Sequence, residues 1–474
     1  MTIARLGAEA RDYSKAIVNI LIREQESTRP VPTLAVVGPV KNIEERIKTM
    51  LRPGKKFYRR PSLVAAAIAL VLTLLTVPTA LVLTARAETK ALPHKEVEAN
   101  AFGKLEYVEH LTREDLLSVT SIETSPDGRY AYAAAYIPSA LLTFKRDPGT
   151  GYLEHIQTIS YPNTYNDNND LNGAVGALVS PDGRYVVCVS FRSNTVSLFE
   201  RDSSKGLLKK LDTVRQNERG GQGLTWVIAD VFSPDSRFVY VIADRSAALS
   251  VFGITENKKL ALVECSKGED NCFDGARGIA VSPDGKYVYV VSYRANTLVV
   301  LERDPETGKT KVKQLITDEK GDVHGLAGVW SVGCSSDGMF VYTSAGRRQN
   351  DQFPGDNAIC VFKRMPDGTL SLIQEVFDGR QGVSGFIGGN ELRVSPDGQN
   401  LYALGSRSNS VVAFRRNPET GQLAYLQTFY DSEVAGKEGS ASGIGISPDG
   451  EYVYVAGEFD KSILIFKRLT GTAK

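Results

Sequence analysis

Five arginines recur at one position in successive loops of the chain. Each stands in a short loop between two apolar runs, about 50 residues from the next; they are Arg192, Arg245, Arg294, Arg347 and Arg407. A guanidinium group is planar and permanently charged, and it can bind a carboxylate or phosphate through two parallel hydrogen bonds. If these loops meet on one face, they predict a site for an anionic ligand.

These arginines could instead have a structural role, which their recurrence in the repeat favours. A residue that returns in repeat after repeat often serves the repeat itself. Here each arginine could pair with an acid in an adjacent loop, such as Asp170, Asp274 or Asp378. An arginine paired in this way loses most of its field at a distance.

Residues that the repeat does not require are better candidates for chemistry. Trp330 could stack on a sugar or another ring, Arg277 could hold an anion, and Asn390 offers a further ligand contact. Glu391 and His324 could transfer protons to a lactone carbonyl or to the water that attacks it. Packing of Trp330 and solvation of His324 are the plainer alternatives.

The sequence predicts no metal site and no cofactor. The histidines do not form the H-E-x-x-H pattern of a zinc peptidase; they are His94, His110, His155 and His324. The acidic loop at residues 164–172 lacks the spacing of a calcium loop, so we expect a solvated turn. A net charge of +1 argues against nucleic acid as a partner.

Repeated strands must position these residues. A tetrapeptide S-P-D-G, or a close variant, begins at Ser125, Ser180, Ser233, Ser282, Ser335, Ser395 and Ser447. Its proline presets φ, its aspartate bonds the local backbone and its glycine supplies positive φ, so we interpret the motif as a hairpin turn and not as a set of catalytic acids. Seven units of about 50 residues, each with up to four apolar runs, predict an all-β, seven-bladed β-propeller.

The two ends of the repeat region are expected to close the ring. The seventh unit ends after three apolar runs, whereas the segment 103–111 matches the fourth runs at 151–159 and 421–429. An N-terminal strand that completes the last blade would leave no free sheet edge. Loops between second and third strands then share one face with the loops that join blades, so the arginines and the channel residues would converge there.

Residues 103–468 resemble the lactonase-type seven-bladed propellers and the related YVTN-type repeats. S-P-D-G turns followed by Y-V-Y-V and by N-T-L-V-V-L-E-R-D-P-E-T-G-K carry the resemblance. It implies the propeller fold and, as an activity, hydrolysis of a sugar lactone, as by a 6-phosphogluconolactonase. Lactonase relatives tend to carry histidine near the start of the innermost strands. No histidine stands at the entry positions of this chain, which are Thr120, Val175, Ile228, Arg277, Trp330, Asn390 and Ser442.

An apolar run at residues 63–85 predicts one transmembrane helix. Its 23 uncharged residues can cross a hydrocarbon core of about 30 Å. Residues 46–60 hold seven Lys or Arg and no acid, so the positive-inside rule places the N-terminus in the cytoplasm and the propeller in the periplasm or outside the cell. We expect the anchor to remain uncleaved.

The segment before this run, residues 1–60, is expected to form short basic amphipathic helices in the cytoplasm. Residues 10–87 resemble the C-terminal end of BlaR/MecR-type membrane metallopeptidases, on the runs YSKAIVNILIREQ and GPVKNIEERIKTMLRPGKKFYRRPSLVAAAIALVL. Because the zinc motif is missing, no peptidase activity is expected. The resemblance suggests a sensor, with a cytoplasmic partner on residues 8–51.

The sequence therefore predicts cytoplasmic helices at 1–60, an anchor at 61–87, a linker at 88–101 and a propeller at 102–470. The expected function is recognition of an anionic small molecule, glycan or protein on the loop face. A lactone hydrolase and the input domain of a membrane sensor are the alternatives. Cys265 and Cys272 share a loop and could form a disulfide outside the cytoplasm, a question that the sequence leaves open.

Overall fold

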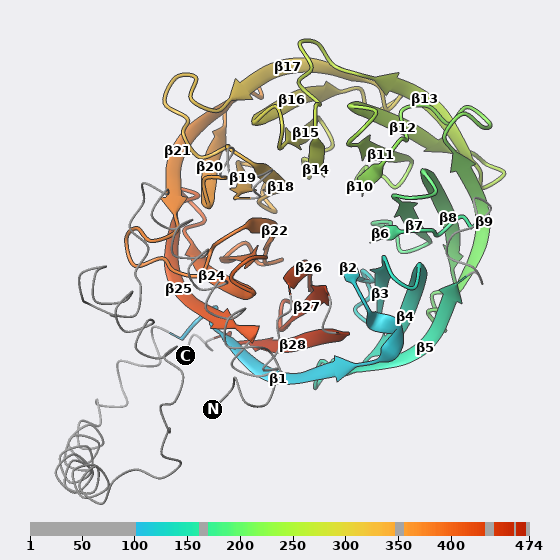
Figure 1. Ribbon diagram of the computed structural model, residues 1–474, viewed down its shortest axis with the longest axis horizontal. Helices are drawn as coiled ribbons and strands as arrows, with labels where there is room; N and C mark the ends of the chain where they lie inside the picture. Colours follow the sequence, from blue (N-terminus) through green and yellow to red (C-terminus); the bar gives the residue numbers. More distant parts are fainter. Residues whose placement is uncertain (1–100, 161–168, 347–354, 432–439, 459–460, 471–474) are drawn as a thin grey trace, which may run out of the picture. The chain divides into compact units, whose positions relative to one another are not determined.

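The computed structural model describes residues 101–160, 169–346, 355–431, 440–458 and 461–470. Seven four-stranded antiparallel sheets stand radially around a central channel (Figure 1). Apart from the single turn of 3-10 helix η2 (Glu114–Leu116), the described residues contain no helix. The prediction of an all-β, seven-bladed β-propeller is confirmed.

The blades follow one another along the chain, and each runs from its innermost to its outermost strand. Blades one to three contain β2 (Val119–Thr124), β3 (Tyr130–Ala135), β4 (Ala140–Arg146) and β5 (Leu153–Ser160); β6 (Ala174–Val179), β7 (Tyr185–Ser190), β8 (Thr195–Arg201) and β9 (Leu208–Arg215); and β10 (Val227–Phe232), β11 (Phe238–Ala243), β12 (Ala248–Ile254) and β13 (Leu260–Ser266). Blades four to six contain β14 (Ala276–Val281), β15 (Tyr287–Ser292), β16 (Thr297–Arg303) and β17 (Thr310–Thr317); β18 (Val329–Cys334), β19 (Phe340–Ala345), β20 (Ala358–Arg364) and β21 (Leu370–Phe377); and β22 (Gly389–Val394), β23 (Asn400–Gly405), β24 (Ser410–Arg416) and β25 (Leu423–Tyr430).

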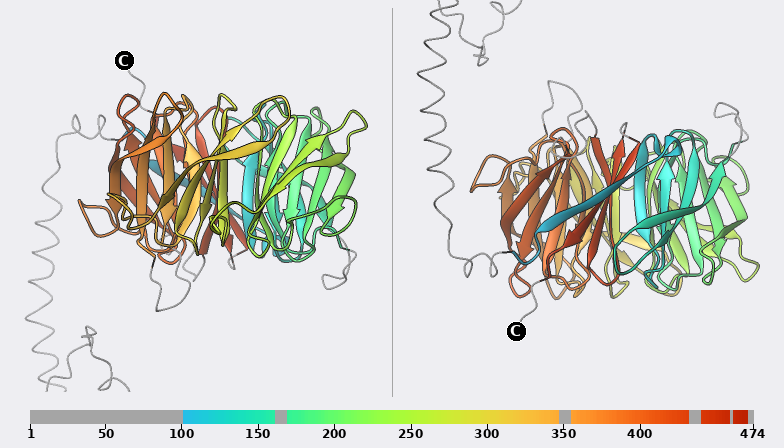
Figure 2. Two further views of the ribbon diagram at one scale, coloured as in Figure 1. Left: turned by 90° about the horizontal axis from the view of Figure 1, so that it is seen from above. Right: turned by 90° about the horizontal axis from the view of Figure 1, so that it is seen from below.

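The seventh blade joins the two ends of the propeller. It consists of β26 (Ser440–Ile446), β27 (Tyr452–Glu458) and β28 (Ser462–Arg468), with β1 (Leu105–Thr112) antiparallel to β28 on the outside. Figure 2 shows β1 lying along the outer edge of this blade. The predicted closure by the N-terminal segment is therefore confirmed, and the ring has no unpaired seam.

The S-P-D-G motif forms the turn between the first and second strands, as predicted. In blade one the Ser125 hydroxyl donates to Asp127 Oδ1 over 2.6 Å and accepts from the Tyr130 amide. Gly128 has φ of +69°, which a side chain would strain. The aspartate is thus held inside the turn, where its second oxygen is free to face the next blade.

Buried arginines use that second oxygen to fasten neighbouring blades. Arg201, the last residue of β8, donates through Nε to Tyr132 (2.8 Å) and through Nη2 to Asp127 (2.7 Å) of blade one, and through Nη1 to Gly183 in its own blade. Burial alone would raise the pKa of Asp127, but the hydrogen bonds from Arg201 and Ser125 outweigh it and hold that pKa well below its usual value. We call this arrangement the arginine clamp.

Corresponding arginine–aspartate contacts occur at six of the seven blade junctions in the described residues. They join Arg146 to Asp449, Arg201 to Asp127, Arg303 to Asp235, Arg364 to Asp284, Arg416 to Asp337 and Arg468 to Asp397. At the junction of blades two and three, Val187 stands at the tyrosine position and Ile254 at the arginine position. Buried aliphatic and aromatic side chains pack at that junction, as they do at the others, and the Asp182 amide donates to Ser236 Oγ across it.

The described part of the chain has no helix long and apolar enough to span a membrane. The apolar run at 63–85 and the helices expected at 1–60 lie outside the described residues. The membrane anchor, its orientation and the cytoplasmic segment therefore stay predictions.

We expect Arg201→Met to destabilise the protein strongly. The Arg201 side chain is 2% exposed, and its loss would remove one donor from the Asp127 carboxylate and the Nε donor from the Tyr132 hydroxyl. Losing charge-assisted hydrogen bonds at this part-buried pair costs about 1.5–3 kcal/mol, measurable as a lower melting temperature. Arg184→Met is the matched control, because its pair with Asp182 is on the surface and should contribute less than about 1 kcal/mol. Equal effects of the two changes would contradict the clamp.

Candidate functional site

A β-bulge opens the first strand of every blade at the same place. The pairing of the first and second strands shifts register just after the strand begins, and the extra residue turns into the channel. The bulged residues are Thr120, Val175, Ile228, Arg277, Trp330, Asn390 with Glu391, and Ser442. These include all seven entry positions singled out in the sequence.

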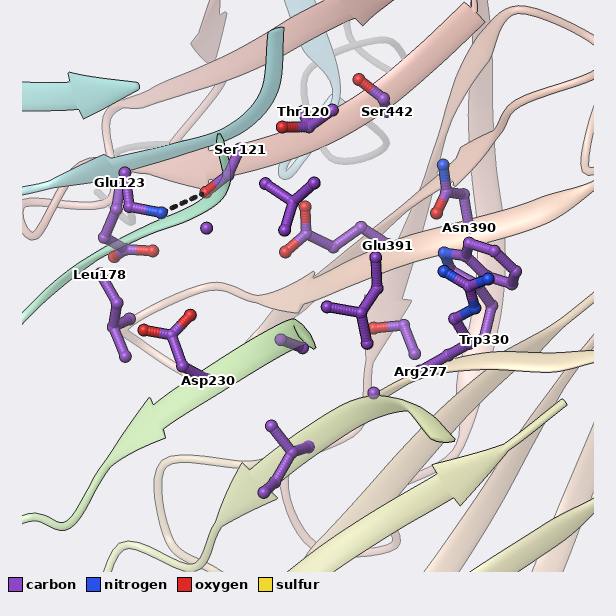
Figure 3. A pocket seen from close by; sticks show the side chains of 18 of the residues that line it. Thr120, Ser121, Glu123, Leu178, Asp230, Arg277, Trp330, Asn390, Glu391 and Ser442 are labelled. Atoms are coloured by element: carbon purple, nitrogen blue, oxygen red, sulfur yellow. Dashed lines mark hydrogen bonds between the residues drawn. The ribbon is translucent and has the colours of Figure 1, made fainter. Parts of the chain in front are cut away.

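The bulged residues surround a cavity of about 390 Å³ in the channel (Figure 3). All seven blades contribute to its lining. Blade six has a bulge of two residues, and the second of them, Glu391, also lines the cavity. Arg277, Trp330, Asn390 and Glu391 therefore lie around one space, as the sequence analysis expected of channel residues.

Two carboxyl groups that the sequence analysis missed face this cavity. Glu123 comes from β2 and Asp230 from β10, and Figure 3 shows their carboxyl groups turned toward the same space. Blade two lies between them with Gly176, where an added Cβ would stand 2.5 Å from Asp230 Oδ1. The missing side chain of Gly176 makes room for the Asp230 carboxyl. Among the described residues, Asp230 Oδ2 is buried without a hydrogen-bond partner.

Both carboxyl groups hold their protons unusually strongly. Burial raises the pKa of Asp230 to about 8, and the negative charge of Glu123 adds to the effect. Burial also raises the pKa of Glu123 to about 7, although the positive charge of Arg393 opposes the shift. Both pKa values therefore lie near neutral pH, and Glu123 releases its proton more readily than Asp230.

Arg393 links this pair to Glu391. Its guanidinium contacts Glu391 Oε1 and lies 3.9 Å from Glu123 Oε2. The second oxygen of Glu391 accepts a hydrogen bond from the Ile444 amide over 2.9 Å, which ties blade six to blade seven. Burial raises the pKa of Glu391, while Arg393 and this amide oppose the shift. The Glu391 side chain is thus held between Arg393 and the Ile444 amide.

At the mouth of the cavity, Arg277 lies against two aromatic rings. Its guanidinium carbon is 4.5 Å from the centroid of Trp330 and 5.1 Å from that of Tyr293. Asp244 Oδ2 accepts a hydrogen bond from Arg277 over 2.6 Å. These contacts fix the guanidinium in one orientation, which suits recognition of a planar anion better than a mobile side chain does.

The five loop arginines do not behave alike. Arg294 pairs with Asp274 over 2.9 Å and also with Asp244, so the structural alternative is confirmed for this residue. Arg192, Arg245 and Arg407 are exposed, and within the described ranges no ion pair is found for them. Arg347 lies outside the described residues.

Among the described residues, Asp170 and Asp378 form no ion pair with a loop arginine. Asp170 instead pairs with Lys210 and Arg215, each over 2.8 Å. Asp378 accepts a hydrogen bond from the Phe386 amide.

His324 lies apart from the cavity. It is exposed in the connection from β17 to β18, where its amide donates to Glu375 Oε1 over 2.6 Å, and it is not among the residues that line the cavity with Glu391. The structure therefore does not bring the proposed Glu391–His324 pair together. The reason is that His324 precedes the bulge of its blade by several residues and stays in the outer connection.

The structure also bears on the cysteine pair, on metal binding and on the acidic loop. Cys265 and Cys272 are both free, so the disulfide left open by the sequence is absent. Groups of three or more residues able to hold a metal are not found in the described residues. The acidic loop at 164–172 is described only from residue 169, where Asn169 Oδ1 accepts a hydrogen bond from the Leu171 amide.

The sequence did contain a signal for the polar residues of the cavity, and Asp230 shows it. Asp230 is the fourth residue of its innermost strand, a position that other blades fill with Ile122, Ala177, Ile279 and Val332. A carboxylate at an otherwise apolar repeat position predicts a polar channel. The alignment of turns and loops alone did not reveal it.

Fold and site together define a seven-bladed β-propeller with a polar cavity at its centre. The family model described as "Lactonase, 7-bladed beta-propeller" matches residues 94–227 and 229–435, which is more than half of the chain. The chain belongs to this lactonase family. The match begins at residue 94, so the resemblance of residues 10–87 to BlaR/MecR-type proteins stays a prediction.

Relatives and solved structures agree with this assignment. An uncharacterized protein of Lactococcus lactis is 28% identical over 233 residues, covering 48% of this chain and 64% of that protein. A 6-phosphogluconolactonase of Formosa agariphila is 24% identical, covering 66% of this chain and 85% of that enzyme. A putative 6-phosphogluconolactonase of Bacteroides fragilis, solved by crystallography, shares the fold with a TM-score of 0.53 and 19% identity, over 74% of this chain and 91% of that one.

The pKa of Asp230 predicts how stability depends on pH. The folded chain keeps this proton up to about pH 8, whereas an unfolded chain releases it near pH 4. The group therefore makes the protein less stable as pH rises between these values. We expect D230N to raise the melting temperature at pH 8.5 by about 2 °C or more, with little difference near pH 4. Asp322→Asn, an exposed site, is the control; an equal change in both variants would contradict the assignment.

Proposed function

We propose that the protein hydrolyses a sugar-type lactone in its central cavity. One observation carries the proposal: Glu123 and Asp230 face a cavity of about 390 Å³ with pKa values of about 7 and about 8. Two titratable groups whose environments separate their pKa values near neutrality suit a reaction that needs one acid and one base. The cavity is within the range of volumes usual for small-molecule sites.

The reaction needs only water and the two carboxyl groups. Glu123, the more readily ionised of the two, takes a proton from a water molecule, whose oxygen forms a bond to the lactone carbonyl carbon. The tetrahedral intermediate then breaks its bond to the ring oxygen, and Asp230 gives that oxygen its proton. The products are a hydroxyl group and a carboxylic acid. Proton transfer from Glu123 to Asp230 restores the starting state.

The arginines are suited to stabilise the negative charge that develops. Arg393 lies beside Glu123 and is held by Glu391, so it can face the oxyanion without moving. Arg277, held by Trp330 and Asp244 at the mouth, is placed to bind an anionic group elsewhere on the substrate. The relative from Formosa agariphila is named for a phosphorylated sugar lactone, which has this combination of a lactone ring and an anionic group.

Recognition without hydrolysis is the second candidate. Arg192, Arg245 and Arg407 are exposed on the loop side and could bind an anionic molecule, glycan or protein whether or not the cavity is catalytic. A sensor that transmits such binding to a partner on residues 8–51 is a form of this candidate.

Activity of the full chain on 6-phosphogluconolactone and on glucono-lactone tests the proposal. We expect hydrolysis above the buffer rate, and a fall in kcat of at least about 100-fold in E123Q and in D230N, because each removes a proton-transfer group. Glu106→Gln, an exposed carboxyl on β1, should keep full activity. Hydrolysis at the buffer rate by a folded wild-type chain, or full activity in both cavity variants, would instead favour recognition alone.

We also propose that residues 63–85 anchor the propeller outside the cytoplasm. The support is the uncharged run of 23 residues with basic residues before it. In cells, we expect the full chain to stay with membranes at high salt and its propeller to be digested by protease added outside the cytoplasmic membrane. Release of the chain by salt, or protection of the propeller in intact spheroplasts, would contradict the anchor or its orientation.

A further inference from the structure

An aromatic stack leads from the cavity mouth across blades one to three. Tyr136 and Phe191 line the cavity, with ring centroids 6.3 Å apart. Phe191 in turn stacks on Trp226, at 5.3 Å and an interplanar angle of 27°. Trp226 is not part of the cavity lining and is 38% exposed. The stack therefore extends the site from the cavity to the turn that precedes β10 in blade three.

Trp226 occupies a backbone position that suits glycine. The residue just before the innermost strand has positive φ in each of the six blades where it is described: Ser118, Gly173, Trp226, Gly275, Gly328 and Gly388. Its carbonyl accepts a hydrogen bond from the residue after the second strand, as Gly173 does from Phe191 and Trp226 from Asp244. The repeat therefore requires positive φ at this position, but it does not require the indole side chain of Trp226.

The conformation of Trp226 is unfavourable, and burial does not compensate for it. A bulky residue at φ of +59° is an outlier, because its Cβ crowds the backbone. More than a third of the side chain remains in solvent, so packing accounts for only part of the stabilisation. Strained residues of this kind gather at sites that bind ligands.

Two arginines are held at the ends of the stack. The Arg192 guanidinium lies 4.6 Å from the ring centroid of Tyr136 and donates through Nε to its hydroxyl over 3.0 Å. The Arg245 guanidinium lies 5.1 Å from the ring centroid of Trp226. Neither forms an ion pair with a carboxylate of the described residues, in contrast to Arg294 in the next blade. Their charge is therefore available to a ligand.

We propose that this stack is a second subsite, which binds the further sugar units of an acidic oligosaccharide. The exposed part of Trp226 can contact the apolar face of a pyranose ring, and the ring-held guanidiniums can bind its carboxylates bidentately. An oligosaccharide fits because the subsite is continuous with the cavity mouth and extends beyond it. The inference goes beyond the proposed hydrolysis, since binding here needs no turnover.

Equilibrium binding of trigalacturonate to the full chain tests the subsite. The chain has two tryptophans, so a W330F background lets fluorescence report on Trp226 alone. We expect quenching on binding, an affinity at least tenfold higher than that for monomeric galacturonate, and weaker binding at 500 mM than at 50 mM salt. Maltotriose, which is neutral, should bind at least tenfold more weakly.

W226G is the decisive variant, because glycine suits this backbone position. We expect it to keep or raise the melting temperature while titration calorimetry shows at least a tenfold loss of affinity for trigalacturonate. R245M should weaken binding similarly, whereas R380M, which changes an exposed arginine between β21 and β22, should not change it. The proposal would be overturned if W226G kept its affinity for trigalacturonate or if maltotriose bound equally well. It would also be overturned if the folded chain preferred ATP to trigalacturonate, or did not bind trigalacturonate. Trigalacturonate binding that persists in D230N would show that the subsite does not depend on the proposed hydrolysis.

Discussion

Contact between neighbouring blades through buried guanidinium groups is the constraint on which this propeller depends. Arg201 shows the pattern, because its guanidinium contacts Asp127 and Tyr132 of one blade and Gly183 of its own blade at once. Because the clamp arginine ends the third strand and its aspartate lies in the turn after the first, the contact sets the angle between successive sheets. Six clamps and one junction without a clamp join the seven blades into the ring around the channel.

The clamp leaves the opposite end of each blade free for chemistry. S-P-D-G turns and clamps belong to one end of the sheets, whereas the bulges occur at the start of the innermost strands. A bulge changes the direction of one side chain without changing the strands on either side. Residues as different as Thr120, Arg277 and Trp330 can therefore occupy equivalent places on an unchanged scaffold. In this fold, the residues that can determine function lie at positions that the repeat does not constrain.

This division explains what the sequence could predict. The blade number, the closing strand and the channel entry positions follow from turn chemistry and from strand period, which are local. The partners of charged residues are not local: Arg294 meets Asp274 as expected, but Asp170 meets Lys210 and Arg215. Those contacts depend on how two blades are oriented. The place of Asp230 in the cavity that Glu123 also lines depends in addition on the missing side chain of Gly176, which no single strand reveals.

The one junction without a clamp separates the blades that carry this carboxyl pair. Glu123 belongs to blade one and Asp230 to blade three, and the aliphatic contact around Val187 and Ile254 lies between blades two and three. Apolar contacts have no preferred direction, so they resist sliding less than a guanidinium bound to three acceptors does. At that junction the Asp182 amide also donates to Ser236 Oγ and Lys258 pairs with Glu200, so it has polar contacts but no buried guanidinium. A substitution that repacked this junction would therefore act on the spacing of the Glu123 and Asp230 carboxyl groups without breaking any arginine clamp.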